Sequence, residues 1–178
     1  MITIENLSFQ LFLSEKDILE KIQSLSKQIE EKYQDKNPLF ICVLKGGFMF
    51  SSELLRNFNF DYELAFVRVK SYDGTQSANE IKEFYGLESN LENRHVVILE
   101  DIVETGFTTH YLISKINTEK PASVAITTML YKPNKLEFKA LPIEHVCFEI
   151  ADEFVVGFGL DYNEKGRNLR SIYQLTSS

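Results

Sequence analysis

The chain has 178 residues, of which 44% are hydrophobic and 25% are charged, a balance that suits one globular domain with an adequate core. The net charge of −7 argues against a general nucleic-acid-binding protein but leaves room for a local basic site that binds a polyphosphate. There is no apolar stretch of membrane-spanning length and no signal-peptide pattern, so we expect a cytoplasmic protein with neither membrane nor nucleic-acid partners. Cys42 and Cys147 lie in apolar runs without zinc-ligand spacing, which predicts two buried, reduced thiols.

The N-terminal segment is predicted to be extended and then helical. Apolar residues roughly alternate over residues 4–13, which indicates extended backbone. Ser14 can cap a helix that continues to Tyr33, before Asn37-Pro38 ends it. Its apolar face is predicted to contain Ile18, Leu19, Ile22, Leu25, Ile29 and Tyr33.

Residues Leu39–Leu44 form a continuous apolar run, as expected for a strand that is buried on both faces of a parallel sheet. The run leads through Lys45-Gly46-Gly47 into a predicted helix over Phe48–Phe58, which together resemble the first half of a βαβ unit. The turn would place backbone N–H groups and the Lys45 ammonium at the carboxyl end of the sheet, where open α/β folds bind ligands. Taken alone, a plain Gly-Gly connector with a solvated lysine explains this turn equally well.

A third strand is predicted over Leu64–Tyr72, and the polar residues 73–80 follow it with almost nothing to bury. A long polar loop inside a compact domain is often a lid, so we expect residues 73–80 to be mobile in the absence of ligand.

The most informative stretch is residues 95–109. It begins with the buried-strand pattern Val96–Leu99, which Glu100 and Asp101 follow. The loop from Glu104 to Thr109 then turns at Gly106 into a new helix, whose free N–H groups and threonine hydroxyls suit a phosphate group. The two carboxylates beside this loop can hold ribose hydroxyls or a hydrated Mg²⁺.

The remaining elements are predicted with less detail. The helix continues to Ile116, a strand covers Ser123–Leu130 with Lys132 at its end, and an irregular connection covers residues 136–142. Further strands are expected over His145–Ile150 and Ser171–Leu175, on either side of a polar and aromatic segment at residues 152–167.

The stretch at residues 95–109 resembles the ribose-phosphate-binding signature of the type I phosphoribosyltransferases, which use phosphoribosyl pyrophosphate (PRPP). The segment Asp152–Arg167 resembles the hypoxanthine-guanine, purine-salvage branch of that family. Two positions depart from the family pattern. Glu104 stands where the family usually has Asp, and Phe107 stands where many members have a polar or basic residue.

The resemblance implies a role for each matching residue. Glu104 is implied as the general base, with Arg167 as the second catalytic residue. Lys45, Gly46 and Arg167 would bind pyrophosphate, and Ser71 and Tyr72 would begin the lid. The PRPP ribose and 5′-phosphate would be bound by Glu100, Asp101, Thr105, Gly106, Phe107, Thr108 and Thr109. The purine would be bound by Lys132, Phe154, Val155 and Asp161, and the implied cofactor Mg²⁺ would be held by Glu100, Asp101 and Asp161. Purine-salvage members also have a non-proline cis peptide in the loop that contains Lys45.

The implied fold is α/β, with a parallel sheet flanked by helices and a small hood. We expect a single phosphoribosyltransferase domain over residues 1–178, with the core at about 37–135 and the hood at about 1–13 and 136–178. The implied assembly is a homodimer or homotetramer.

The implied reaction is the transfer of 5-phosphoribosyl from PRPP to hypoxanthine or guanine, which gives IMP or GMP and pyrophosphate. Two alternatives stay open at this stage: a nucleotide-binding regulatory paralogue with weak or no turnover, supported only by Glu104 and Phe107, and an enzyme that prefers xanthine.

Overall fold

The main sheet has six strands in the order β5-β4-β3-β6-β7-β8 in the computed structural model, which describes residues 1–71, 81–85 and 90–176. Five of them run parallel, and β5 is antiparallel to β4. The strands are β3 (Leu39–Leu44), β4 (Glu63–Ser71), β5 (Ile81–Tyr85), β6 (His95–Val103), β7 (Ser123–Tyr131) and β8 (Ile143–Glu149). The predicted parallel sheet is therefore confirmed, whereas the short strand β5 was missed.

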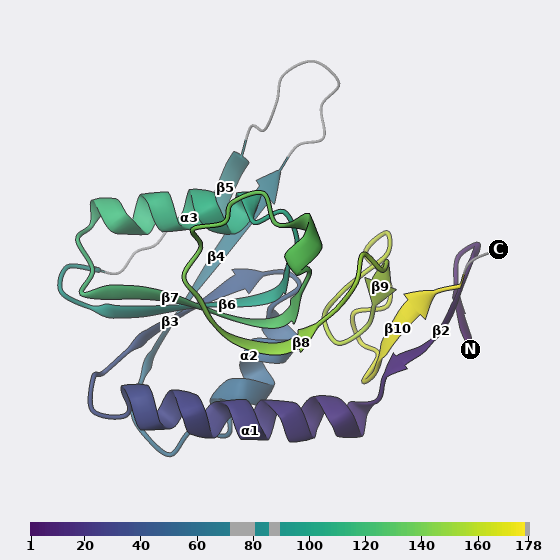
Figure 1. The fold of residues 1–178 in the computed structure, drawn as a ribbon, viewed down its shortest axis with the longest axis horizontal. Helices are drawn as coiled ribbons and strands as arrows, with labels where there is room; N and C mark the ends of the chain where they lie inside the picture. Colours follow the sequence, from purple (N-terminus) through teal and green to yellow (C-terminus); the bar gives the residue numbers. More distant parts are fainter. Residues whose placement is uncertain (72–80, 86–89, 177–178) are drawn as a thin grey trace.

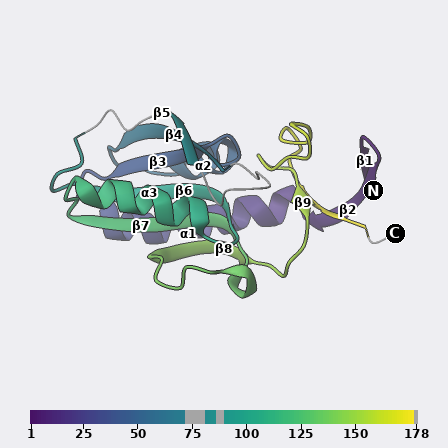
Figure 2. The same cartoon turned by 90° about the horizontal axis from the view of Figure 1, so that it is seen from above.

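Helices cover both faces of this sheet, as Figures 1 and 2 show. α1 (Glu15–Tyr33) and α2 (Phe48–Leu55) pack on one face, and α3 (Phe107–Thr118) packs on the other. The short 3₁₀ helix η1 (Pro133–Lys135) follows β7. Each face of the sheet has its own hydrophobic core, and alternate residues of β6 point to the two faces. Val97 and Leu99 pack in the core beneath α1 and α2, and Val96 and Ile98 pack in the core beneath α3.

The start of α1 confirms the prediction from sequence. The Ser14 hydroxyl accepts a hydrogen bond from the Asp17 N–H at 3.2 Å, which satisfies one of the free donors of the first turn. Leu19 was wrongly placed on the buried face, because it lies one residue beyond the stripe that begins at Ile18 and is 37% exposed. Both thiols, Cys42 and Cys147, are buried and unpaired, as expected.

A second, four-stranded sheet forms the hood, in the order β1-β2-β10-β9. It combines β1 (Ile2–Ile4) and β2 (Leu7–Leu13) with β9 (Val155–Val156) and β10 (Ile172–Leu175), and Figure 1 shows it at one end of the main sheet. Both termini therefore contribute to the hood, as expected. The expected boundary near residue 136 was wrong, because β8 pairs with β7 and extends the main sheet to Glu149.

Candidate active site

A cavity of about 390 Å³ opens at the carboxyl ends of β3 and β6. All the residues that were predicted from the sequence to bind PRPP and pyrophosphate line it: Lys45, Gly46, Glu100, Asp101, Thr105, Gly106, Phe107, Thr108, Thr109 and Arg167. Glu104, the expected general base, and Asp161, expected to bind the purine and the metal, line it as well. Lys45 and Gly46 follow β3, and the residues from Glu100 to Thr109 run from β6 into α3. Asp161 and Arg167 come from the hood segment. The cavity thus lies where the core and the hood meet.

Glu100 and Asp101 lie within β6, which continues to Val103 rather than ending at the carboxylates. Because strand side chains alternate, Glu100 points to the α3 face and Asp101 to the α2 face. The Thr109 hydroxyl donates to Glu100 at 3.3 Å, and the Ile102 N–H donates to Asp101 at 3.0 Å. The two carboxylates therefore approach the cavity from opposite faces of the same strand.

Burial disturbs the protonation of both carboxylates. Removal from water raises the pKa of Glu100 well above its usual range, and the neighbouring charge of Asp101 raises it further. Burial also raises the pKa of Asp101 from 3.8 to about 6, against the opposing effect of hydrogen bonds from the backbone. The nearby Arg167 guanidinium opposes this effect at Asp101. A buried and a partly buried carboxylate on one strand thus provide an attractive site for positive charge.

The loop that enters α3 has the geometry of a phosphate-binding turn. Gly106 has a φ of 80°, a left-handed conformation that suits glycine, and a Cβ there would lie 2.6 Å from Leu141. The N–H of Phe107, the first residue of α3, donates to the Thr105 hydroxyl at 3.3 Å. The N–H groups of the first turn have no acceptor within the helix, and their residues line the cavity. The Thr109 hydroxyl, which we expected to meet phosphate, is instead engaged by Glu100.

The connection at residues 136–142 packs against this loop. The Glu137 N–H donates to the Thr105 carbonyl at 3.0 Å, and the Phe138 ring lies 6.1 Å from that of Phe107 and 4.4 Å from that of His110. The unusual Phe107 side chain therefore has a packing role, which leaves its backbone N–H at the start of α3.

The loop after β3 contains the non-proline cis peptide Leu44–Lys45, as the resemblance implied. The next residue, Gly46, is pressed against Asp101, since a Cβ at Gly46 would lie 1.5 Å from the Asp101 Oδ2 atom. A glycine at this position therefore allows the buried carboxylate to reach the cavity.

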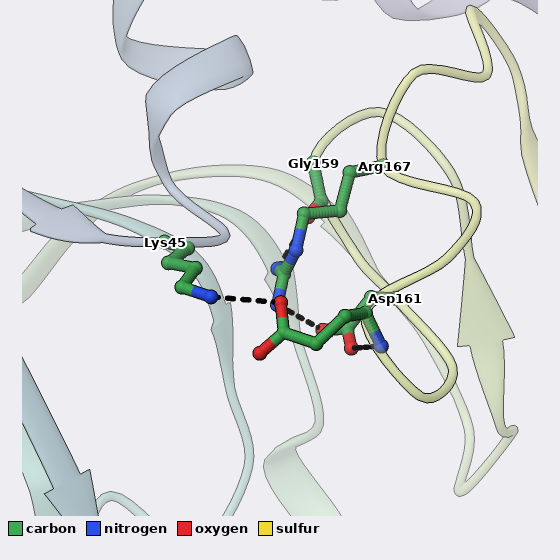
Figure 3. A network of polar contacts seen from close by, with 5 residues as sticks. Lys45, Gly159, Asp161 and Arg167 are labelled. Carbon is green, nitrogen blue, oxygen red and sulfur yellow. Dashed lines mark hydrogen bonds and ion pairs between the residues drawn. The ribbon is translucent and has the colours of Figure 1, made fainter.

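Charged groups from the loop after β3 and from the hood meet at the cavity rim (Figure 3). Arg167 forms an ion pair with Asp161 at 2.6 Å and donates to the Gly159 carbonyl at 2.9 Å. Glu164 forms ion pairs with both Lys45, at 2.9 Å, and Arg167, at 3.1 Å. Glu164 was not predicted as a site residue, because in the sequence it is one of several charges in a polar loop.

Of the residues expected to bind the purine, Asp161 lines this cavity, whereas Lys132, Phe154 and Val155 are not part of its lining. Glu104 links the cavity to Lys132. Its carboxylate lines the cavity and forms an ion pair with Lys132, whose side chain is only 4% exposed. Lys132 also lies 3.5 Å from Asp152, which in turn pairs with Lys135 at 2.6 Å. A solvated loop lysine at position 132 is therefore ruled out.

The other two purine-end residues differ in exposure. Phe154 is 45% exposed and its ring lies 6.0 Å from Tyr162 and 6.3 Å from Phe9, so one aromatic face remains accessible. Val155 is buried in β9. Ser71 is the last residue of β4, whereas Tyr72 and the expected lid at residues 73–80 lie outside the described residues.

The acidic groups fit Mg²⁺ only in part. Mg²⁺ prefers hard oxygen ligands and usually takes one or two carboxylates together with water and substrate phosphates. Glu100 and Asp101 suit this arrangement, but Asp161 is already paired with Arg167. Within residues 1–71, 81–85 and 90–176, no group of three His, Cys, Asp or Glu side chains could hold a metal ion. The expected three-carboxylate site is therefore not preformed.

The fold and the cavity are those of a phosphoribosyltransferase. A family model described as the phosphoribosyl transferase domain matches residues 12–163, and the chain belongs to this family. No helix in the described part of the chain is both long and apolar enough to cross a membrane.

Individual relatives narrow the comparison. The chain is 41% identical over 163 residues to the hypoxanthine-guanine phosphoribosyltransferase of Streptococcus thermophilus, with 90% of this chain and 89% of the relative aligned. It is 34% identical over 169 residues to the hypoxanthine-guanine-xanthine phosphoribosyltransferase of Tritrichomonas foetus, with 95% and 92% aligned. The crystal structure of a Staphylococcus aureus hypoxanthine phosphoribosyltransferase superposes with a TM-score of 0.89 at 37% identity, covering 97% of this chain and 93% of the other.

Proposed function

We propose that the chain is a purine-salvage enzyme that transfers 5-phosphoribosyl from PRPP to hypoxanthine or guanine, giving IMP or GMP and pyrophosphate. The observation that supports this most strongly is the cavity itself, in which a phosphate-binding helix start, two buried carboxylates and the cations Lys45 and Arg167 converge. Relatives with the same enzyme names over nine tenths of the chain favour this function over a regulatory paralogue.

Each part of PRPP has a suitable partner. The 5′-phosphate suits the N–H groups of residues 105–109, because a helix start offers free donors and a favourable dipole. The ribose hydroxyls suit Glu100 and Asp101. The pyrophosphate suits Lys45 and Arg167, which would stabilise the negative charge that develops as it leaves. Mg²⁺, held by Glu100 and Asp101 together with PRPP, would add Lewis-acid stabilisation of that charge.

Glu104 is the proposed general base. The purine must lose a ring proton as the new C–N bond forms. Two observations support Glu104 as its acceptor: the residue lines the cavity, and its carboxylate pairs with Lys132. Lys132 would donate to the exocyclic oxygen of a 6-oxopurine, and its present partner Glu104 would then be free to accept the ring proton. An adenine amino group would offer Lys132 no comparable acceptor.

The assay that tests this function follows nucleotide formation from PRPP, Mg²⁺ and each of hypoxanthine, guanine, xanthine and adenine. Glu104→Gln should lower turnover by about 10²–10⁴-fold with unchanged folding, as expected for the loss of a general base. Glu104→Asp is the matched control because it restores the residue usual in the family. Unchanged turnover in Glu104→Gln would rule out Glu104 as the base. Turnover absent from the wild type but present in Glu104→Asp would favour the regulatory alternative, and rapid turnover of xanthine would favour the xanthine alternative.

The expected oligomer has a candidate interface on the outer side of α2 and β4. Phe48, Leu64 and Phe66 are each more than 40% exposed there, beside a cavity of about 330 Å³ that Leu55 and Tyr62 also line. Exposed apolar patches of this kind mark association surfaces, and a second copy of the chain would cover it. Light scattering should therefore give at least a dimer mass for the wild type and a lower mass for Phe66→Lys; an unchanged mass would exclude this surface.

A further inference from the structure

Glu164 lies between the two cations that are proposed to bind pyrophosphate. Its Oε2 atom is 2.9 Å from Lys45 Nζ and 3.1 Å from an Arg167 terminal nitrogen. Lys45 belongs to the loop after β3 and Arg167 belongs to the hood segment, and both are labelled in Figure 3. The Glu164 carboxylate therefore links the core side of the cavity to its hood side.

The local backbone holds Glu164 in this position. Its N–H donates to Asp161 at 2.8 Å, and both Asn163 and Glu164 have left-handed φ values, 51° and 63°. Residues other than glycine rarely adopt this conformation, so the turn is well defined rather than arbitrary. The Glu164 side chain nevertheless remains 63% exposed and can swing away without disturbing the core.

Arg167 is held at the cavity by contacts that do not involve Glu164. Asp161 pairs with its guanidinium at 2.6 Å, and the Gly159 carbonyl accepts from it at 2.9 Å. These two contacts would keep the guanidinium beside the cavity after Glu164 has moved away.

We propose that Glu164 is an internal competitor of pyrophosphate. In the free protein its carboxylate occupies the cations that the polyanion needs, so binding must first break both ion pairs. The same carboxylate returns to Lys45 and Arg167 when pyrophosphate leaves. Glu164 thereby weakens the affinity for pyrophosphate and speeds its release, a role that depends on the proposed function of this site.

The test measures binding of inorganic pyrophosphate, with and without Mg²⁺, by titration calorimetry on wild type and Glu164→Gln. Exposed ion pairs are individually weak, so we expect the dissociation constant to fall by about five- to twenty-fold in the variant. Rapid-mixing experiments should show slower pyrophosphate release by a similar factor.

Glu5→Gln is the matched control. It removes the same charge beside the same turn, where Glu5 pairs with Lys165 at 3.0 Å and accepts from Asn163 at 2.9 Å, without a contact to Lys45 or Arg167. This variant should bind pyrophosphate within about two-fold of the wild type. Ribose 5-phosphate, which would use the α3 loop with Glu100 and Asp101 but neither Lys45 nor Arg167, should bind equally to all three proteins.

Two results would overturn the inference in different ways. Equal pyrophosphate affinity in wild type and Glu164→Gln, or equal tightening in Glu5→Gln, would remove the competitor role while leaving the proposed enzyme function intact. No binding of pyrophosphate to either the wild type or Glu164→Gln would remove both, because the cations would then not form a polyanion site.

Discussion

Asp101 provides the sharpest quantitative prediction, because burial raises its pKa from 3.8 to about 6. At about 1.4 kcal/mol per pKa unit, this difference corresponds to roughly 3 kcal/mol of destabilisation when the group is ionised. Asp101 is partly exposed to the cavity, so we reduce the figure to about 2 kcal/mol. Asp101→Asn keeps an oxygen that can accept from the Ile102 N–H but removes the charge.

Asp101→Asn should therefore unfold at a higher temperature than the wild type but bind Mg²⁺ and PRPP more weakly. In a domain of this size, about 2 kcal/mol corresponds to roughly 4–8 °C in Tm. Thermal unfolding followed by circular dichroism at pH 7.5 measures the gain, and titration with Mg²⁺ and PRPP should show at least ten-fold weaker binding. Asp61→Asn, at an exposed position, controls for the change in net charge.

The sign of the pH dependence follows from the raised pKa. A carboxyl whose pKa is higher in the folded state destabilises the fold above that pKa, and protonation relieves the cost as the pH falls toward the unfolded value. The stability advantage of Asp101→Asn should thus shrink by about half between pH 7.5 and pH 5. A variant less stable than both wild type and Asp61→Asn at pH 7.5, or an advantage that grows on acidification, would refute the reasoning.

Two further predictions concern the backbone around the site and the packing of α1. Gly46→Ala should lower turnover by at least about 100-fold, because the new Cβ would lie 1.5 Å from Asp101 Oδ2 and force that carboxylate to move; wild-type kinetics would contradict the close approach. Ser14→Ala should cost about 1 kcal/mol in denaturant unfolding through loss of the helix cap, with unchanged turnover, and no change in the unfolding midpoint would show that the cap is dispensable.

Elements whose buried residues recur at regular spacing could be predicted from the sequence. β3 is a continuous apolar run and α1 has apolar residues at helical spacing, and the structure confirmed both elements. β5 was missed because its residues Ile81–Tyr85 show no clear alternation and its strand character depends on pairing with β4. The hood boundary was wrong for a similar reason, since β8 belongs to the main sheet only through its register with β7.

The candidate site could be predicted as a set of residues but not as a set of partners. The motif at residues 95–109 identified the cavity lining, yet nothing in it indicates that the Thr109 hydroxyl turns to Glu100. Likewise, Glu164 forms one ion pair with Lys45, which is 119 residues away in the sequence, and another with Arg167, which is three residues away. Of these contacts, only the one between Lys45 and Glu164 depends on the position of the hood beside the core.

The pairing of β2 with β10 also affects how the protein is made. Ile172 lies opposite Leu13, and the Ser171 hydroxyl accepts from the Glu15 N–H at 3.0 Å, so segments from the two ends of the sequence depend on each other. During translation β2 leaves the ribosome before the main sheet, while β10 and the adjoining segment with Arg167 leave after it. The main sheet can fold before then, but β2 keeps an unpaired edge until β10 arrives, and such edges invite aggregation. The rim formed by Lys45, Glu164 and Arg167 is consequently completed only after the main sheet, and a nascent chain shortened before β10 would contain most of the cavity-lining groups without the complete hood sheet.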